Sequence, residues 1–297
     1  MTWKRIATAA ILTPAVVAIV LLSSTAVVAI ATALITVLAL REYFALGDAI
    51  GHRAYRLWTI FCSIVLVLMQ SSSSLLHLDY VFSKSSAQTS FLFEPLAERL
   101  PLLNSLPTVF FLFIAGISCL TLWTRRPLVE SLPAAGISSS ALLLISFPLS
   151  FAVKLHALPF GFGPRLLLFA LVITWVADTT AYFVGRATGK HALAPHISPK
   201  KTWEGSVGGM IGSLLAAYAF SCWIHIPLIH LLIMAALGNI AGQMGDLAES
   251  AWKRSSGVKD SGGLLPGHGG VLDRIDALIL CIPIIWFYLV LVNPPTV

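Results

Sequence analysis

Charged residues are the scarcest component of this sequence. Only 11% of its 297 residues are Asp, Glu, Lys or Arg, whereas 57% are hydrophobic and the mean hydropathy is +0.88. A soluble globular domain has about 25% charged and about 45–50% apolar residues. The composition therefore excludes an ordinary soluble domain and favours an integral membrane protein.

Paired cysteines and nucleotide-binding motifs are also missing. No CxxC or metal-ligand spacing occurs, and we expect the single cysteines to be small core residues. The "GHGG" turn at 267–270 is neither a Walker loop nor a GxGxxG fingerprint, so taken alone it is a weak motif. No aromatic-basic motif for nucleic acid, internal repeat or soluble domain is present. The cysteines are Cys62, Cys119, Cys222 and Cys281.

Long apolar runs are what the sequence does contain. A helix needs roughly 20 apolar residues to cross a bilayer, and the runs are continuous rather than alternating as in a β-barrel. A second run follows the first almost at once, which favours an uncleaved first span over a signal peptide. We predict an all-α polytopic membrane protein with about nine transmembrane helices, at 6–22, 25–40, 57–70, 107–123, 135–154, 164–184, 205–223, 226–245 and 275–292.

These spans divide the chain into two predicted regions. Residues 1–134 hold about four transmembrane helices, and 135–297 form a catalytic region of about five, with cytoplasmic loops at 185–204 and 246–274. Between the third and fourth spans, the serine-rich stretch 71–90 is expected to be an exposed loop. The stretch that follows it, 91–107, could form an interfacial helix.

Lysine and arginine set the orientation, because cytoplasmic loops carry an excess of both. With a cytoplasmic N-terminus, 15 of the 19 cations fall on the inside and 4 on the outside, so we expect the C-terminus to lie outside. The net charge of +6 is then a topology signal. The inside cations are Lys4, Arg5, Arg41, Arg53, Arg56, Arg125, Arg126, Arg186, Lys190, Lys200, Lys201, Lys253, Arg254, Lys259 and Arg274; the outside ones are Lys84, Arg99, Lys154 and Arg165.

The same topology gathers the unusual acids at the cytoplasmic side. Asp178 lies late in the sixth predicted span, Asp246 ends the eighth, and Asp273 and Asp276 open the ninth. A charge at mid-helix costs about 2.5–3.5 kcal/mol on insertion scales. Several acids at one membrane face would repel each other, and a bound cation or paired lysines would relieve that repulsion.

Each feature also has a simpler interpretation. Asp273 and Asp276 could be a helix N-cap and its capping-box-like partner. Glu249 and Lys253 are four positions apart and could form only a surface pair. Likewise, Lys200 and Lys201 could only anchor the topology, Asp178 could pair with Arg186, and His268 could be an ordinary loop histidine.

The combination of features indicates one kind of site. Glycines let a backbone approach phosphate, and the N–H groups of a helix N-terminus attract anions. Aspartates at the same helix start would repel phosphate unless a divalent cation lay between them, and Mg²⁺ prefers carboxylate, phosphate and water oxygens. Lysines and arginines beside them can hold the remaining phosphate charge. The sequence therefore predicts a metal-dependent phosphate site at the cytoplasmic membrane surface.

Residues 250–276, "SAWKRSSGVKDSGGLLPGHGGVLDRID", carry a family resemblance. They resemble the signature of the phosphatidate cytidylyltransferases, or CDP-diacylglycerol synthases: S-x-(apolar)-K-R-x4-K-D-x-G-x2-(apolar)-P-x-H-G-G-(apolar)-x-D-R-(apolar)-D. Every fixed position matches, and Trp252 stands where a smaller apolar residue is usual. The upstream stretches "ADTTAYFVGR", "SPKKTWEG" and "GQMGDLAES" are similar to other blocks of the family, whereas the N-terminal half resembles it only in hydropathy.

The resemblance implies that CTP and phosphatidic acid give CDP-diacylglycerol and pyrophosphate, by in-line attack of the lipid phosphate on the α-phosphorus of CTP. It implies that Asp246 and Asp273 hold Mg²⁺, assisted by Asp276, with a monovalent cation, K⁺, beside it, and that the protein is a homodimer. By motif, the catalytic residues would also include Lys253, Lys259 and His268, and the substrate-binding ones would be Asp178, Ser198, Lys200, Lys201, Thr202, Arg254, Gly269, Gly270 and Arg274.

Three alternatives stay open at this point. One is the same chemistry with another lipid phosphate as acceptor. Another is an ion-coupled membrane transporter, which would place acids near mid-bilayer within inverted repeats. The third is a metal-dependent phosphosugar transferase that acts on polyprenyl phosphate. An assay of nucleotide dependence would separate them.

Overall fold

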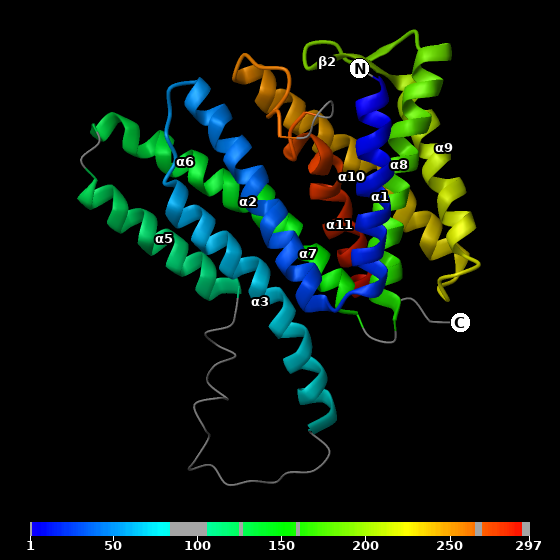
Figure 1. The fold of residues 1–297 in the computed structure, drawn as a ribbon, viewed down its shortest axis with the longest axis horizontal. Coiled ribbons are helices and arrows are strands. Elements are labelled where there is room, and N and C mark those ends of the chain that lie inside the picture. The colour runs from blue at the N-terminus through cyan, green and yellow to red at the C-terminus, as the bar shows by residue number, and fades with distance from the viewer. Residues whose placement is uncertain (1, 84–105, 125–126, 159–160, 265–268, 293–297) are drawn as a thin grey trace.

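The computed structural model describes residues 2–83, 106–124, 127–158, 161–264 and 269–292, which form a bundle of long helices (Figure 1). The helices of the first half are α1 (Thr2–Leu22), α2 (Thr25–Ala49), α3 (Arg56–Ser83), α5 (Leu106–Trp123), α6 (Ser131–Ala141) and α7 (Phe147–His156), with the short turns η1 (Leu128–Glu130) and η2 (Leu142–Ser146). The second half contains α8 (Phe162–Thr188), β1 (Ala192–Ala194), β2 (Ser198–Thr202), α9 (Trp203–Phe220), α10 (Leu228–Ser255) and α11 (Leu272–Val292).

Each of the nine predicted spans falls on a helical segment. Among the described residues, six helical segments are long and apolar enough to cross a membrane, as expected of an all-α multi-pass membrane protein. The helix α9 is not one of them, because its four glycines, two serines and Glu204 lower its hydropathy. The six are Thr25–Ala49, Leu106–Trp123, Leu128–His156, Phe162–Thr188, Leu228–Ser255 and Leu272–Val292.

The segment from α6 to α7 is one continuous helix with a π turn at Leu142–Ser146. Pro148 stands at the start of α7, directly after this turn. A proline ring clashes with the carbonyl four residues earlier and supplies no N–H, and a local wide turn relieves both defects. This stretch is therefore one continuous helical segment that is long and apolar enough to cross a membrane once.

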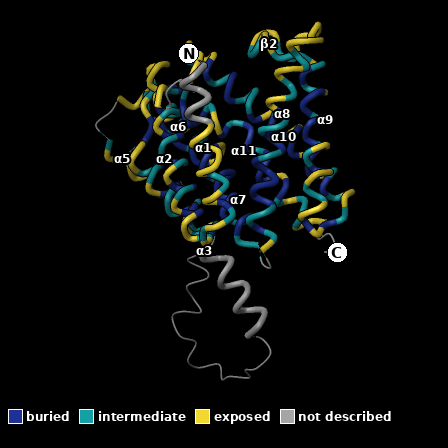
Figure 2. The backbone as a smooth tube through the Cα atoms, turned by 45° about the vertical axis from the view of Figure 1, so that its right-hand side comes forward, coloured by how far each residue is buried: buried dark blue, intermediate teal, exposed yellow. Residues whose placement is uncertain are grey.

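The core lies where α7 and the first part of α11 meet the surrounding helices, and both of these segments are largely buried (Figure 2). Phe151 of α7 packs against Trp286 and Phe287 of α11, with ring centroids 5.1 and 5.2 Å apart. The main hydrophobic cluster joins Phe44 of α2 to residues of α8 and α11. Both predicted regions of the chain thus contribute to one core.

Glycines bring the helices of the second half into close contact. A Cβ at Gly212 of α9 would lie 2.4 Å from Thr180 Oγ1 of α8, and one at Gly245 of α10 would lie 2.4 Å from the carbonyl oxygen of Asp276 in α11. Small residues at membrane helix interfaces allow such close backbone approach. This packing sets α8, α10 and α11 close enough for their acidic side chains to interact.

Three expectations about boundaries are wrong. The helix α10 continues to Ser255, so Asp246 lies about two and a half turns before its end. The region 185–204 is mostly the end of α8 and an antiparallel hairpin of β1 and β2 rather than a loop. In 71–90, the first part is helical, because α3 continues to Ser83.

Residues 84–105, with most of the suggested interfacial helix, lie outside the described residues. Among the cysteines, Cys62 and Cys281 are buried as expected. The expectation is wrong for Cys119 and Cys222, which are exposed on the surface of the bundle.

Candidate active site

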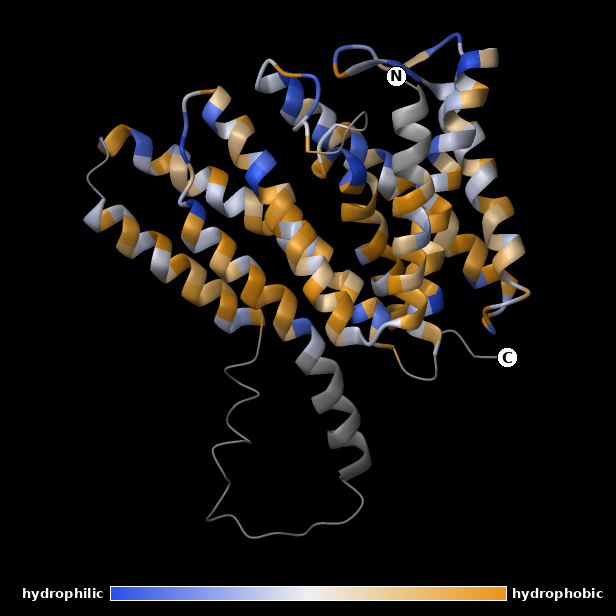
Figure 3. Cartoon of the chain, in the orientation of Figure 1, coloured by the Kyte–Doolittle hydropathy of each residue, from blue (hydrophilic) through white to orange (hydrophobic). Residues whose placement is uncertain are grey.

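The polar residues of the second half gather at one end of the bundle. The end of α8, the β1–β2 hairpin, the end of α10 and the start of α11 all lie there (Figure 1), and Figure 3 shows the hydrophilic colours concentrated at this end. Chain direction explains the meeting, because α8 and α10 run toward this end and α9 and α11 run away from it. The predicted gathering of acids is therefore present at one end of the bundle.

Three acids from three helices form what we call the acidic cluster: Asp178 of α8, Asp246 of α10 and Asp276 of α11. Asp178 and Asp276 both lie within electrostatic range of Asp246 and of each other. Lys201 of the hairpin forms an ion pair with Asp246, and Arg274 also acts on Asp178. Two cations thus face three acids, and a further cation would relieve the repulsion among them.

A second charged group lies beside it and is more buried. Lys253 Nζ lies 2.5 Å from Glu249 Oε2 and 2.6 Å from Asp273 Oδ1, and the Glu249 side chain is fully buried. The contact with Glu249 is an ion pair without the geometry of a hydrogen bond. The interpretation of Glu249 and Lys253 as a surface pair is therefore wrong, because α10 turns this face toward α11.

Asp273 also fixes the loop that precedes it. Its Oδ2 accepts hydrogen bonds from the N–H groups of Gly270 at 2.8 Å and Ser261 at 3.1 Å. Gly269 has φ of +80°, and a Cβ there would lie 2.8 Å from the same oxygen. Glycine is thus required for the loop to fold back onto Asp273.

The capping-box interpretation of Asp273 and Asp276 does not describe this helix start. The Asp273 carboxylate accepts N–H groups that lie before α11, and one Asp276 oxygen accepts the N–H of its neighbour Ala277. The N–H groups of Val271 and Leu272, at the start of α11, donate instead to Glu42 of α2. Sequence reasoning missed Glu42, and the clue to it was an acid that follows directly after the apolar run at 25–40.

The hairpin presents the predicted lysines at the edge of the acidic cluster. Lys200 is exposed, whereas Lys201 turns toward Asp246. Thr202 has a structural contact, because its Oγ1 accepts the N–H of Gly205 at 3.1 Å and caps α9. Ser198 is half-buried at the start of β2.

Two contacts hold this hairpin in place. Arg254 at the end of α10 donates to the carbonyls of Ile197 and Val258. On the other side, His191 Nδ1 lies 2.6 Å from Glu204 Oε1. Hydrogen bonds from its own backbone N–H and from His191 lower the pKa of Glu204 to about 2, so this carboxylate stays charged.

The remaining predicted residues are less closely gathered. Lys259 and Arg274 are exposed beside the loop, and His268 lies outside the described residues. In the part of the chain that the structure describes, no group of three or more His, Cys, Asp or Glu side chains is arranged to hold a metal ion. The acidic cluster supplies oxygen donors only, which is the donor type that Mg²⁺ accepts, and Mg²⁺ often needs only one or two carboxylates when phosphates and water complete its shell.

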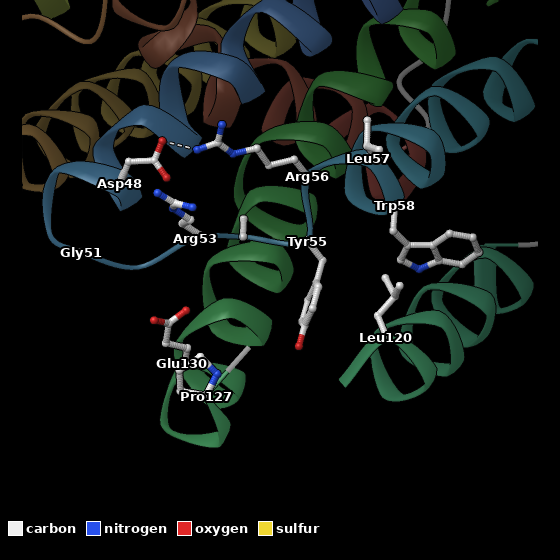
Figure 4. A pocket seen from close by; sticks show the side chains of 11 residues that line it. Asp48, Gly51, Arg53, Tyr55, Arg56, Leu57, Trp58, Leu120, Pro127 and Glu130 are labelled. Atoms are coloured by element: carbon white, nitrogen blue, oxygen red, sulfur yellow. Dashed lines mark hydrogen bonds and ion pairs between the residues drawn. The ribbon is translucent and has the colours of Figure 1, made fainter. Parts of the chain in front are cut away.

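A cavity of about 1200 Å³ lies elsewhere, at the connection between α2 and α3 (Figure 4). Arg56 and Asp48 form an ion pair on its wall, and Trp58 and Leu120 line its apolar side. None of its lining residues belongs to the signature region. We therefore take the acidic cluster, and not this cavity, as the candidate active site.

Comparison with known proteins gives consistent results. A family model described as "Cytidylyltransferase family" matches residues 3–292. The phosphatidate cytidylyltransferase of Bacillus subtilis (strain 168) is 39% identical over 183 residues, which cover 60% of this chain and 68% of that protein. The one of Haemophilus influenzae is 38% identical over 172 residues, covering 56% and 59%.

A third relative matches over a shorter stretch but at higher sequence identity. The phosphatidate cytidylyltransferase of Staphylococcus saprophyticus is 48% identical over 125 residues, which cover 41% of this chain and 48% of that protein. The chain thus matches from about half to about two thirds of the length of these curated relatives.

Proposed function

This chain belongs to the cytidylyltransferase family, and we propose that it transfers a cytidylyl group from CTP to phosphatidic acid. The lipid phosphate oxygen forms a bond to the α-phosphorus of CTP, the bond from that phosphorus to the bridging oxygen breaks, and pyrophosphate leaves with the electron pair. The observation that carries the proposal is the acidic cluster with Lys201 at one end of the bundle, built by the family signature and by the upstream stretches that resemble other blocks of the family. The relatives named for this activity support it.

The residues act mainly by positioning and by charge. Transfer of a phosphoryl-type group asks little covalent chemistry of the protein, so orientation and electrostatic stabilisation dominate. Lys201 and the exposed Lys200 and Lys259 bind phosphate oxygens of CTP or lipid. The lipid phosphate is already ionised, so it attacks without a dedicated general base.

Buried Lys253 has a different task. Its ammonium forms ion pairs with the carboxylates of Glu249 and Asp273, so it holds Asp273 in place and neutralises part of the charge on Glu249. Arg274 and His268 orient the phosphates from the loop side, and Gly269 and Gly270 let the loop pass close to Asp273.

Asp246 is the carboxylate that we assign first to a Mg²⁺ ion, with Asp276 beside it in the acidic cluster, Asp273 as a further ligand and K⁺ as a second cation. The oxygen-only donors and the excess of carboxylates over cations in the acidic cluster support this assignment. When bound, Mg²⁺ would neutralise charge that develops on the phosphates.

The reaction takes place where both substrates can reach it. CTP is a cytosolic solute, whereas phosphatidic acid keeps its acyl chains in the bilayer. We therefore place the polar end of the bundle at the cytoplasmic face of the inner membrane, with nine spans, the N-terminus inside and the C-terminus outside. The catalytic region is 135–297, and the distribution of lysine and arginine supports the orientation.

Two exposed positions at opposite ends of the bundle can test this orientation. A variant whose single cysteine is the native Cys222, between α9 and α10, should react with a membrane-impermeant thiol reagent on intact cells. The matched variant, with Cys222→Ser and His196→Cys in the hairpin, should react only after permeabilisation. The opposite pattern would place the site outside the cell and contradict the proposal.

The two neighbouring lysines of the hairpin make a matched pair. Lys201→Gln should lower kcat/KM for CTP by about 10–100-fold, because a charge-assisted hydrogen bond contributes about 1.5–3 kcal/mol. Lys200→Gln, at the exposed position, should cost less than about tenfold, and the double variant should lose more than either. Steady-state kinetics in detergent micelles measure this, and unchanged kinetics for Lys201→Gln would leave only a role in topology.

A nucleotide-dependence assay tests the function itself. Purified protein with labelled phosphatidic acid should form CDP-lipid with CTP and no product with a UDP-sugar. Product from a UDP-sugar would support the phosphosugar transferase instead, and exclusive use of another lipid phosphate would change the assigned acceptor. Ion-driven uptake into vesicles without any nucleotide product would identify a transporter.

A further inference from the structure

Glu42 of α2 reaches across the bundle into the signature region. Its Oε1 accepts the N–H of Val271 at 3.0 Å, and its Oε2 accepts the N–H of Leu272 at 2.8 Å and the hydroxyl of Ser261 at 3.1 Å. At least 219 positions separate Glu42 from each of these partners. A single side chain from the N-terminal region thus accepts three hydrogen bonds from the loop and helix start next to Asp273.

The loop is shaped around this carboxylate. A Cβ at Gly262 would lie 2.4 Å from Glu42 Oε1, and a Cβ at Gly270 would lie 2.4 Å from Glu42 Oε2. Any larger residue at either position would displace the carboxylate or the loop. These two glycines therefore leave the space that Glu42 fills.

Glu42 and Asp273 hold the same short segments from two sides. The N–H of Ser261 donates to Asp273, while its hydroxyl donates to Glu42. The N–H of Gly270 donates to Asp273, and the next two N–H groups donate to Glu42. A displacement of the Glu42 carboxylate would move the loop and with it Asp273. Because Lys253 is paired with Asp273, it would be displaced as well.

The charge of Glu42 suits its place. A helix N-terminus carries partial positive charge, and its first N–H groups have no partner within the helix. A carboxylate there is stabilised without using Lys253, which stays available to Asp273 and Glu249. The cap of α11 is thus supplied by another helix.

The residue after Glu42 extends the contact to α10. Tyr43 packs edge-on against Trp252, with ring centroids 5.4 Å apart, and its hydroxyl lies 2.9 Å from Ser140 Oγ. Trp252 is the one position where the sequence departs from the signature. The contact gives this larger residue a partner on α2 and fixes α2 next to the end of α10.

We propose that Glu42 is a positioning residue for cytidylyl transfer: it caps α11 from outside the signature and fixes residues 261–262 and 270–272 so that Asp273 is held in its working orientation. The inference rests on the proposed function. It also means that the N-terminal region is part of the catalytic machinery rather than only a membrane anchor.

Three variants test this. Glu42→Ala removes all three acceptor contacts, Glu42→Gln keeps the shape and one acceptor oxygen, and Asp48→Ala removes an acid of the same helix whose ion pair with Arg56 lies outside the site. We expect kcat to fall at least about tenfold in Glu42→Ala and less in Glu42→Gln, with KM for CTP changed by less than about threefold. Asp48→Ala should keep the kcat of the wild type.

Hydrogen exchange of the folded protein supplies a readout that does not depend on activity. Amides in 261–264 and 269–272 should exchange faster in Glu42→Ala, and to a smaller degree in Glu42→Gln, while Asp48→Ala leaves them unchanged. If Glu42→Ala does not fold, Glu42→Gln decides, because it retains side-chain size and one of the contacts.

The outcomes separate the two proposals. Wild-type protein that forms no CDP-lipid would defeat the proposed function, whatever the exchange data show. Active wild-type protein together with unchanged kcat and unchanged exchange in Glu42→Gln and in any folded Glu42→Ala would overturn the role of Glu42. Faster exchange with unchanged kcat per folded molecule would also overturn it, since Glu42 would then stabilise the loop without serving catalysis.

Discussion

Asp246→Asn should lower the rate of CDP-lipid formation by about a hundredfold or more, which is the effect of removing a main electrostatic contact from an active site. Asparagine has the size of aspartate but lacks the charge that a hard cation requires. Asp246 is also the partner of Lys201 and the acid that both Asp178 and Asp276 face. Its loss therefore removes the centre of the acidic cluster.

The folded protein should not become less stable in this variant. Removing one of three neighbouring carboxylates relieves repulsion with Asp178 and Asp276, and this offsets the lost pairing with Lys201. We would measure product formation across a Mg²⁺ titration and the thermal midpoint in detergent, with Asp48→Asn as the control. Near-normal rates at ordinary Mg²⁺ would contradict the assignment, and a milder loss in Asp276→Asn would give that residue an assisting role.

Asp273→Asn should lose both turnover and stability. The carboxylate accepts the N–H groups of Gly270 and Ser261 and the Lys253 ammonium, and an asparagine NH₂ would face at least one of these donors. A buried donor left without a partner costs about 1–3 kcal/mol. In a chain of this length that lowers the thermal midpoint by about 2–5 °C, while we expect turnover to fall about a hundredfold or more.

Lys253→Gln supplies the matched variant, because it removes the partner of Asp273 in the same buried group. The combined variant Asp273→Asn/Lys253→Gln should lose less stability than the sum of the single changes, as expected for residues in direct contact. If Asp273 were only a helix cap, Asp273→Asn would cost little activity and little stability, since asparagine caps a helix about as well as aspartate. Normal activity and an unchanged midpoint for Asp273→Asn would therefore exclude the role that we assign to it.

Much of the fold could be predicted because it depends on local pattern. Continuous apolar runs predict the helices, and the polar end of the bundle follows from the position of Asp178, Asp273 and the hairpin lysines in the chain. The end of α10 was harder to predict, because the polar residues after Asp246 could equally belong to a loop. Propensity and packing extend the helix to Ser255.

The contacts that hold the site depend on packing that the sequence does not show. The sequence spacing of an acid and a lysine four positions apart is the same on an exposed helix face and on one packed against another helix. The burial of Glu249 and Lys253 could therefore not be predicted. Glu42 is separated from its partners by more than 200 positions, and only the packing of α2 against α11 brings them together. Gly270 was likewise expected near phosphate, whereas the described structure places it, together with Gly262, against Glu42.

The fate of the two ends of the CTP triphosphate tests the central claim most directly. Purified protein with phosphatidic acid and Mg²⁺ should move the label of α-phosphate-labelled CTP into the lipid, and should release the label of γ-phosphate-labelled CTP as pyrophosphate. Asp246→Asn in the same assay should give neither product above background. Label from the γ-phosphate in the lipid, or lipid product that forms equally well in Asp246→Asn, would contradict cytidylyl transfer at this site.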